Sequence, residues 1–379
     1  MIQNNEEIMR NNTKKLRDSN IEMLRIVAMF LVVLSHFVEY GLMKQGYDST
    51  YKVWAQGCLA RRFISSFCVL GPVGVGLFFM ISGYFLVEKK GLPSLKKIVT
   101  STVFYAWIAI IAGIIQVKFG EVQIGTVSSA ATFLALFFTP VSGSIWWFIT
   151  AYVVLIGLTP VLNKVVSELN RHGMLILLFS AYFFGYICGR FNSHVSDVEI
   201  AVFFYLLGAY FKVFESKNGV GNFTLTAILL SALLIEGFLQ LQGSDSMAVL
   251  AEAGMKKKII STLWYAVVPA LVIPLFCLFQ RMKIKNNRII NTVAAHTLGI
   301  YLFHLSPFVK DFLFYNLIDE AGIYNSEFFF VYLFIVPLLI FIGCLIVDVV
   351  KSVCYEKPLL KWIEKHEEQF CSRFVKTFS

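Results

Sequence analysis

The stretch IEMLRIVAMFLVVLSHF (residues 21–37) decides how the chain is interpreted, because it is an apolar run of bilayer length that contains ionisable side chains. Arg25 and His36 are eleven residues apart. That separation is about three turns of an α-helix, so both side chains lie on one face, roughly 16 Å apart along the axis. An ionisable residue inside a membrane span is costly and usually has a function. The pair therefore predicts a reaction site buried in a membrane.

Composition supports a protein with many membrane spans. Of 379 residues, 57% are hydrophobic and 15% are charged, whereas about 25% are charged in typical soluble proteins. No small-residue cleavage site follows residues 21–37, so this run is expected to be a retained helix and not a signal peptide. The net charge of +9 comes mostly from short connections between apolar runs, which indicates membrane topology and excludes a nucleic-acid-binding surface.

The cysteines exclude two further kinds of site. The chain has seven, an odd number, and none has the C-x-x-C spacing. Neither a disulfide framework nor a metal site is therefore expected.

Hydropathy predicts an all-α bundle of about ten transmembrane helices. The predicted spans cover residues 21–40, 68–87, 98–117, 145–166, 173–190, 197–214, 223–241, 262–280, 293–315 and 327–350. Lysine and arginine concentrate in alternate connections, which places both termini in the cytoplasm. The predicted organisation is a cytoplasmic segment at 1–20, a membrane domain at 21–350 and a cytoplasmic amphipathic tail at 351–379.

His36 is the first candidate for a catalytic residue. A neutral imidazole can take a proton from a hydroxyl while that oxygen attacks a thioester, and can then return the proton to the leaving thiol. Glu39 and Tyr40 follow at i+3 and i+4 on the same helix face, where either can orient the ring. The alternative is a histidine that bonds a backbone carbonyl within a helix bundle. Arg25 on the same face favours the catalytic interpretation.

Arg25 lies about one turn inside the cytoplasmic edge of the first predicted span. A guanidinium at that depth is suited to hold a phosphate group. Two alternatives remain open, because the side chain can snorkel to the interface or pair with Glu22, three residues earlier.

The second predicted span is rich in glycine and is followed by a basic turn. Its sequence GPVGVGLFFMISGY (residues 71–84) leaves room for a ligand beside the backbone, and Ser82 and Tyr84 offer polar groups there. Helix packing is the alternative explanation of the glycines. The four lysines of the basic turn are Lys89, Lys90, Lys96 and Lys97. They suit an anionic cofactor or lipid headgroups, but the positive-inside rule also accounts for them.

Two later spans carry further candidates. Trp147 begins the fourth span with Tyr152 further along, although tryptophan at a span end usually belongs to the interfacial belt. The ninth span carries Tyr301 and His304, a second intramembrane histidine whose role can equally be structural. No G-x-S-x-G elbow, Walker loop or H-E-x-x-H motif occurs in the chain.

Taken in order, these elements resemble the acyltransferase-3 family of integral-membrane acyltransferases. The matching elements are Glu22-x-Leu24-Arg25, Arg25-x10-His36, Phe78-Phe79-x-x-Ser82-Gly83-Tyr84 with its basic turn, Trp147-Phe148 with Tyr152 and Pro160, and Gly299-Ile300-Tyr301-Leu302-x-His304. The chain departs from the family in its lysine-rich turn, where many relatives carry arginines, and in the Leu305-Ser306-Pro307 that follows His304. Its compact form resembles the stand-alone branch that includes polysaccharide O-acetylases.

The resemblance implies an acyl-CoA donor bound from the cytoplasmic side, with no permanently bound cofactor. It implies an acceptor hydroxyl on a cell-surface polysaccharide or a lipid-linked glycan precursor, in a bacterial plasma membrane. By position, His36 would be the base and Arg25 a donor-site residue. Acyl-CoA binding would also involve Lys89, Lys90, Lys96, Lys97, Ser82 and Tyr84. Supporting roles would fall to Glu22, Glu39, Phe78, Phe79, Trp147, Tyr152, Tyr301 and His304.

Three functional hypotheses follow from these observations. The first is an O-acyltransferase, with acetyl as the expected acyl group, whose partners are acyl-CoA, a glycan or glycolipid acceptor and membrane lipids. The second is a transporter or flippase of an anionic or lipid-linked substrate, since many spans, buried charge and glycine-interrupted helices also fit that class. The third is a membrane acyltransferase of unrelated fold in which another histidine, His304, is the base.

Overall fold

The computed structural model describes residues 18–43, 63–119, 135–141, 146–189, 197–215, 219–249, 254–319, 322–323 and 326–378. Every regular element within these residues is a helix, and the predicted all-α bundle is confirmed. The predicted cytoplasmic segment at 1–20 lies outside the described residues, except for its last three.

Eight of the described helices are long and apolar enough to cross a membrane, or nine if one bent pair counts as a single span. The eight cover Ser19–Leu42, Phe63–Leu86, Lys96–Ile115, Trp147–Glu168, Arg171–Cys188, Asn222–Leu239, Thr262–Arg281 and Phe329–Glu367. The predicted span at 197–214 is α10 (Asp197–Val213), whose 17 residues lie at the short end of the range that crosses a bilayer. Hydropathy therefore located a helix at each predicted span, although the structure supports fewer full crossings.

The first span is built from α2 (Ser19–His36) and the π-helical segment η1 (Phe37–Leu42). Asp18 caps α2, because its carboxylate accepts a hydrogen bond from the Asn20 amide at 3.2 Å. The hydroxyl of Ser19 donates to the side chain of Asn291 at 2.9 Å, which ties the start of α2 to the start of the ninth span. The sequence therefore fixes both the first residue of the span and its position in the bundle.

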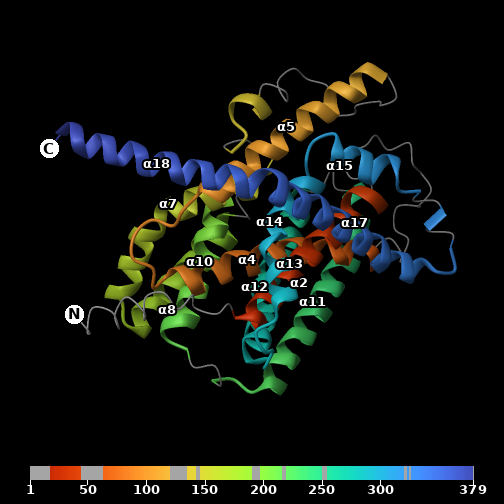
Figure 1. Cartoon of the computed structure of the whole chain (residues 1–379). Helices are drawn as coiled ribbons and strands as arrows, with labels where there is room; N and C mark the ends of the chain where they lie inside the picture. Colours follow the sequence, from red (N-terminus) through yellow and green to blue (C-terminus); the bar gives the residue numbers. More distant parts are fainter. Residues whose placement is uncertain are drawn as a thin grey trace.

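The central helix is α4 (Leu70–Leu86), which packs against α2, α10 and α12 (Gly254–Arg281) (Figure 1). It is apolar on all sides, as expected for a helix surrounded by other helices. Its glycines allow close approach, since a Cβ atom at Gly74 would lie 2.5 Å from the backbone oxygen of Ala28 in α2. The surrounding helices are α5 (Lys96–Phe119), α7 (Trp147–Glu168), α8 (Arg171–Ser180) with η4 (Ala181–Cys188), and α11 (Asn222–Val249).

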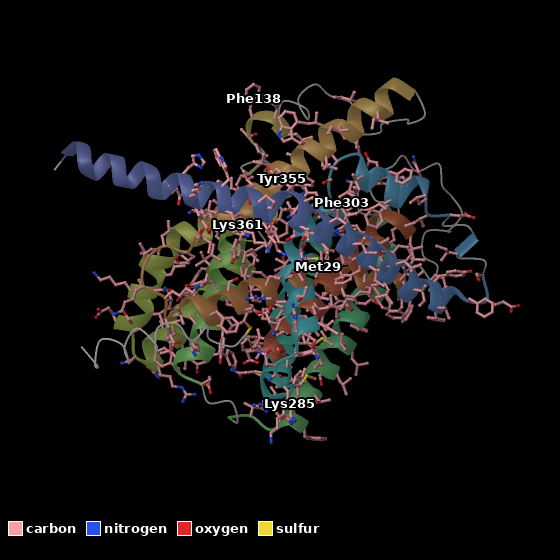
Figure 2. All side chains as sticks on the ribbon, in the orientation of Figure 1. Met29, Phe138, Lys285, Phe303, Tyr355 and Lys361 are labelled. Carbon is pink, nitrogen blue, oxygen red and sulfur yellow. The ribbon has the colours of Figure 1, made fainter. Side chains whose placement is uncertain are left out.

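Apolar side chains both fill the bundle and cover its outside, as expected for a protein in contact with lipid. Met29 in α2 is 3% exposed, whereas Phe138 is 71% exposed and lies at the periphery (Figure 2). Large exposed apolar side chains recur along α8, α11 and α17 (Phe329–Lys351). This distribution is typical of helices that face lipid on one side.

The ninth span is broken. It consists of α13 (Arg288–Ala295) and α14 (Thr297–His304), followed at an angle of 89° by α15 (Val309–Asp311) and η5 (Phe312–Asn316). The bend follows His304 and includes Pro307, and Phe308 has a φ of 67°. A positive φ is uncommon for a bulky residue and marks local strain. The span predicted at 293–315 therefore corresponds to this bent pair of helices, because Pro307 and Phe308 redirect the chain.

The C-terminal part of the chain is one long helix. From α17 the chain passes through the π-helical η6 (Ser352–Glu356) into α18 (Lys357–Phe378), and the three form a continuous rod in Figure 1. The predicted tail from 351 is thus helical and continues the last span directly. Its location at the inner membrane surface stays a prediction.

Candidate active site

His36 is the last residue of α2, and the π-helical segment η1 begins directly after it. Single π-helical turns inside α-helices are frequent at functional sites. The His36 side chain is partly buried, so it is held by the bundle without being sealed off. The predicted base therefore occupies an irregular point of the first span.

His36 is hydrogen-bonded to His304, with 2.9 Å between Nδ1 of His36 and Nε2 of His304. Nδ1 of His304 lies 2.6 Å from the carbonyl oxygen of Ile300. A carbonyl oxygen can only accept, so His304 carries its hydrogen on Nδ1 and its Nε2 has a lone pair. In the neutral pair, Nδ1 of His36 must then donate to His304. This assignment leaves Nε2 of His36 with a lone pair that is available to accept a proton.

The orienting contact therefore comes from His304, in a different span, and not from the predicted neighbours in the same helix. Among the described residues, no hydrogen bond joins Glu39 or Tyr40 to the imidazole of His36. The ring of Tyr40 packs 5.5 Å from that of His36, measured between centroids. The ammonium of Lys310 lies 4.7 Å from the Tyr40 ring centroid, so a cation stands near the histidine pair.

Aromatic residues of α4, α7 and α14 pack in a continuous series beside the histidines. The ring of Phe148 lies 4.9 Å from Phe79, 5.9 Å from Tyr152 and 5.3 Å from Tyr301 between centroids. Tyr301 in turn lies 6.2 Å from the ring of His304. The structure thus gathers predicted supporting residues from three spans into one aromatic cluster that reaches His304.

Ser82 and Phe78 belong to the same region. The hydroxyl of Ser82 donates to the backbone oxygen of Phe78 at 2.8 Å and lies 3.5 Å from the hydroxyl of Tyr152. The ring centroid of Phe148 lies 6.0 Å from that of Phe78 and 6.2 Å from that of Trp147. The motif around residue 82 therefore connects α4 to the aromatic cluster.

Arg25 lies at the other end of α2 and is paired with Glu22. Its Nη1 is 3.2 Å from both carboxylate oxygens, and the two side chains are 30% and 8% exposed. The guanidinium carbon also lies 5.8 Å from the ring centroid of Phe85, at the end of α4. The ion pair is the alternative that the sequence left open. It uses one nitrogen of the guanidinium, so the remaining N–H groups can still bind an anion.

Tyr84 also faces this end of α4, away from the aromatic cluster. Its hydroxyl accepts a hydrogen bond from the amide of Gln280 at 2.9 Å. The ammonium of Lys212 lies 5.2 Å from its ring centroid. The structure therefore separates Tyr84 from Ser82, although the two are close in sequence.

The four lysines of the basic turn divide into two pairs. Lys89 and Lys90 are exposed immediately after α4. Lys96 forms an ion pair with Glu367 of α18. Lys97 donates to the last carbonyl oxygen of α13 at 2.8 Å, so it caps the end of that helix. The structure thus gives Lys97 an internal role, whereas Lys89 and Lys90 project outward.

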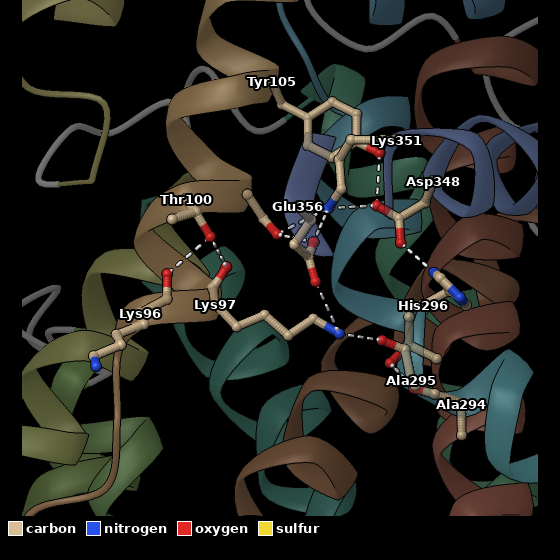
Figure 3. A network of polar contacts seen from close by, with 12 residues as sticks. Lys96, Lys97, Thr100, Tyr105, Ala294, Ala295, His296, Asp348, Lys351 and Glu356 are labelled. Atoms are coloured by element: carbon tan, nitrogen blue, oxygen red, sulfur yellow. Dashed lines mark hydrogen bonds and ion pairs between the residues drawn. The ribbon is translucent and has the colours of Figure 1, made fainter. Parts of the chain in front are cut away.

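A second buried polar cluster lies where α5, α14, α17 and η6 meet (Figure 3). Its members Asp348, Lys351 and Glu356 are 1%, 3% and 4% exposed. The ammonium of Lys351 lies 2.9 Å from Asp348 and 2.5 Å from Glu356. Asp348 and Glu356 were not predicted from the sequence. The available signal was an ionisable pair, three residues apart, at the end of a long apolar run.

Comparison with known proteins assigns the chain to a family. Residues 18–349 match the family model described as "Acyltransferase domain". The chain belongs to the acyltransferase-3 family. No curated protein and no solved structure matched the chain. Family membership and the apolar helices together make it a multi-pass membrane acyltransferase, and the matched range contains every site residue that the sequence predicted.

Removing the imidazole of His304 is expected to weaken catalysis without changing donor binding. His304→Leu leaves Nδ1 of His36 without its acceptor, and losing such an orienting partner typically costs about 10- to 100-fold. His304→Gln should retain more activity, because its amide oxygen can accept the same hydrogen bond. The measurement is kcat and KM for both variants. Equal activities of the leucine and glutamine variants would contradict an orienting role.

Proposed function

We propose that this acyltransferase transfers acetyl from acetyl-CoA to a hydroxyl of a cell-surface polysaccharide or a lipid-linked glycan precursor, in a bacterial plasma membrane. The observation that carries the proposal is the hydrogen bond from His36 to His304. It supports His36 as the general base, because it holds Nδ1 as the donor and directs the lone pair to Nε2.

The reaction needs one base that returns its proton. Nε2 of His36 takes the proton of the acceptor hydroxyl while the oxygen attacks the thioester carbonyl carbon. The tetrahedral intermediate collapses, the C–S bond breaks, and the imidazolium of His36 gives its proton to the departing thiolate. The products are the O-acyl ester and CoA thiol, and the base is restored. His304 is less suited to this task, since its side chain is fully buried and both ring nitrogens are engaged.

The donor is proposed to bind from the end of α2 that carries Arg25. Arg25 and the exposed Lys89 and Lys90 offer cations to the nucleotide phosphates. Arg25 and His36 are roughly 16 Å apart along α2. An extended pantetheine arm would run between the phosphates near Arg25 and the thioester near His36. The aromatic cluster around Phe148 supplies an apolar wall beside the histidines.

The proposal is tested by CoA-thiol release from acetyl-CoA, in membranes that contain this protein and a crude surface-glycan fraction. Release that requires the glycan, together with a base-labile acetyl ester on the glycan, is the expected result. Purified protein in liposomes distinguishes the transport alternative, which predicts movement of a lipid-linked glycan without consumption of acyl-CoA. Transport without thiol release would reject the acyltransferase mechanism proposed here.

Changing Arg25 to lysine is expected to weaken donor binding selectively. Lysine keeps a cation beside the buried Glu22 but loses the planar fork that binds phosphate. One lost charge-assisted hydrogen bond should raise the KM for acetyl-CoA roughly 10-fold and leave kcat nearly unchanged. Arg171→Lys is the matched control, because Arg171 is an exposed arginine on α8 that pairs with Glu215 at 2.6 Å. An unchanged KM in the Arg25 variant would remove this residue from the donor site.

A further inference from the structure

The ninth span is interrupted one residue before the helix that presents His304. α13 ends at Ala295, α14 begins at Thr297, and His296 between them has a φ of −101° and a ψ of −1°. α14 has eight residues, and a helix of that length does not hold its own position without tertiary contacts. Its two ends therefore need anchors.

Asp348 of α17 contacts the first turn of α14 at two points. One carboxylate oxygen lies 2.6 Å from Nδ1 of His296. The same side chain rests against Gly299, where a Cβ atom would lie 1.8 Å from the carboxylate. Glycine at this position is what allows the close approach. Asp348 therefore restrains both the rotation of α14 and its position along the axis.

The carboxylate of Asp348 is itself held firmly (Figure 3). Its Oδ1 accepts the hydroxyl hydrogen of Tyr105 at 2.8 Å and lies 2.9 Å from the ammonium of Lys351. Lys351 also donates to Ser101 at 2.9 Å and pairs with Glu356. A buried carboxylate with three donors is well satisfied, and removing its charge leaves a buried cation short of a partner.

The far end of α14 carries His304. From Gly299 to His304 the helix rises about 7.5 Å, and a slip of one residue would move the histidine by about 1.5 Å. The His36–His304 hydrogen bond of 2.9 Å does not tolerate such a shift. A contact that fixes the start of α14 would therefore also affect the distance between the two histidines.

We propose that Asp348 is a positioning residue, whose contacts with His296 and Gly299 place α14 so that His304 orients His36. The inference rests on the proposed function, since it assigns a role in the same reaction. Asp348 acts through α14 and not on the substrate.

A double-mutant cycle tests this role. Asp348→Asn keeps the size of the side chain but loses its charge, and the resulting misplacement should lower kcat about 10-fold, no more than His304→Leu does, with the KM for acetyl-CoA unchanged. In the His304→Leu background, Asp348→Asn should lower kcat by less than about threefold. The His36–His304 hydrogen bond that Asp348 supports is already absent from that background. Equal losses in both backgrounds would overturn the proposal, since a purely structural defect acts regardless of His304.

Two matched comparisons guard against a variant that fails to fold. Tyr105→Phe removes one hydrogen bond to Asp348 and should give a smaller loss that also disappears in the His304→Leu background. Tyr182→Phe removes a hydroxyl that donates to the Ala266 backbone at 2.9 Å, and it should leave kcat unchanged. A persistent loss for Tyr105→Phe in the His304→Leu background would contradict the proposal.

Hydrogen exchange separates this inference from the proposed function, because it does not require activity. Asp348→Asn should accelerate amide exchange in residues 297–304. Glu356→Gln, which belongs to the same buried cluster but contacts Lys351, Ser101 and Lys97 and not α14 itself, should accelerate exchange there less. Unchanged exchange in α14 of Asp348→Asn would reject the anchoring role even if the transferase reaction is confirmed. Faster exchange without any acetyl transfer would keep the anchor and reject the reaction.

Discussion

Replacing His36 with glutamine is expected to lower kcat for acyl transfer by roughly 10²- to 10⁴-fold, the contribution usual for a general base. Glutamine is close in size and neutral, and its amide can still hydrogen-bond to His304, so the helix contact can persist. It has no lone pair basic enough to take a proton from a hydroxyl. The KM for acetyl-CoA should change little, because the proposed phosphate contacts lie near Arg25.

The measurement is acceptor-dependent thiol release at matched protein levels in membranes. His172→Gln is the control, since His172 is exposed on α8 and takes no part in the site. Both variants should purify as folded protein in detergent, which separates catalysis from stability. Full activity of the His36 variant would reject the assignment of the base, and the His304→Leu loss should be the smaller of the two.

The sequence located the helices well because hydropathy measures the free energy of transferring side chains from water into lipid, which decides where a chain crosses a membrane. Each predicted span has a helix in the structure, and the spacing of Arg25 and His36 placed both correctly within the first one. Phe79 and Tyr301 were also among the predicted supporting residues, whereas Phe148, which joins them, appeared only in the motif of the family resemblance. The sequence pattern did not predict the contacts between these residues, because those contacts depend on how the spans pack against one another.

The pairing of His36 with His304 shows this limit most clearly. The two residues are 268 positions apart, and each was predicted as an intramembrane histidine on its own. Local reasoning offered Glu39 and Tyr40 as orienting groups, because i+3 and i+4 neighbours are the ones that a helix brings together. The bend after His304 was missed as well, because hydropathy predicts one span over residues 293–315 although Ser306 and Pro307 interrupt the apolar run.

Lys97 illustrates a different limit. A lysine at the cytoplasmic end of a span satisfies the positive-inside rule whether it binds a ligand, a lipid or the protein itself. In the structure its ammonium lies 2.8 Å from the last carbonyl oxygen of α13 and 3.7 Å from Glu356. The charge pattern therefore predicted the side of the membrane, and only the tertiary structure distinguishes the partner.

The second large effect is expected from Gly208→Ala in α10. At this position the backbones of α4 and α10 touch, and a Cβ atom would lie 1.9 Å from the backbone oxygen of Met80. The contact is reciprocal, because a Cβ at Gly83 would lie 1.9 Å from the backbone oxygen of Tyr205. No rotamer change can relieve a clash with backbone, so the helices would have to separate. We expect destabilisation on the order of 3 kcal/mol.

Gly157→Ala in α7 is the matched control, since no neighbouring heavy atom lies within 4 Å of the Cβ position. Alanine has the higher helix propensity, so this variant should be neutral or more stable by up to about 1 kcal/mol. The measurement is the midpoint temperature, at which half of each purified variant has lost its monodisperse peak in detergent. A lower midpoint for Gly208→Ala alone would show that the Ser82-Gly83-Tyr84 motif serves helix packing as well as the site.

Because Ser82 contacts Tyr152 while Gly83 contacts α10, loosening this crossing should also reduce activity in the protein that remains folded. Equal midpoints for the two alanine variants would show that α4 and α10 do not approach as closely as the structure places them.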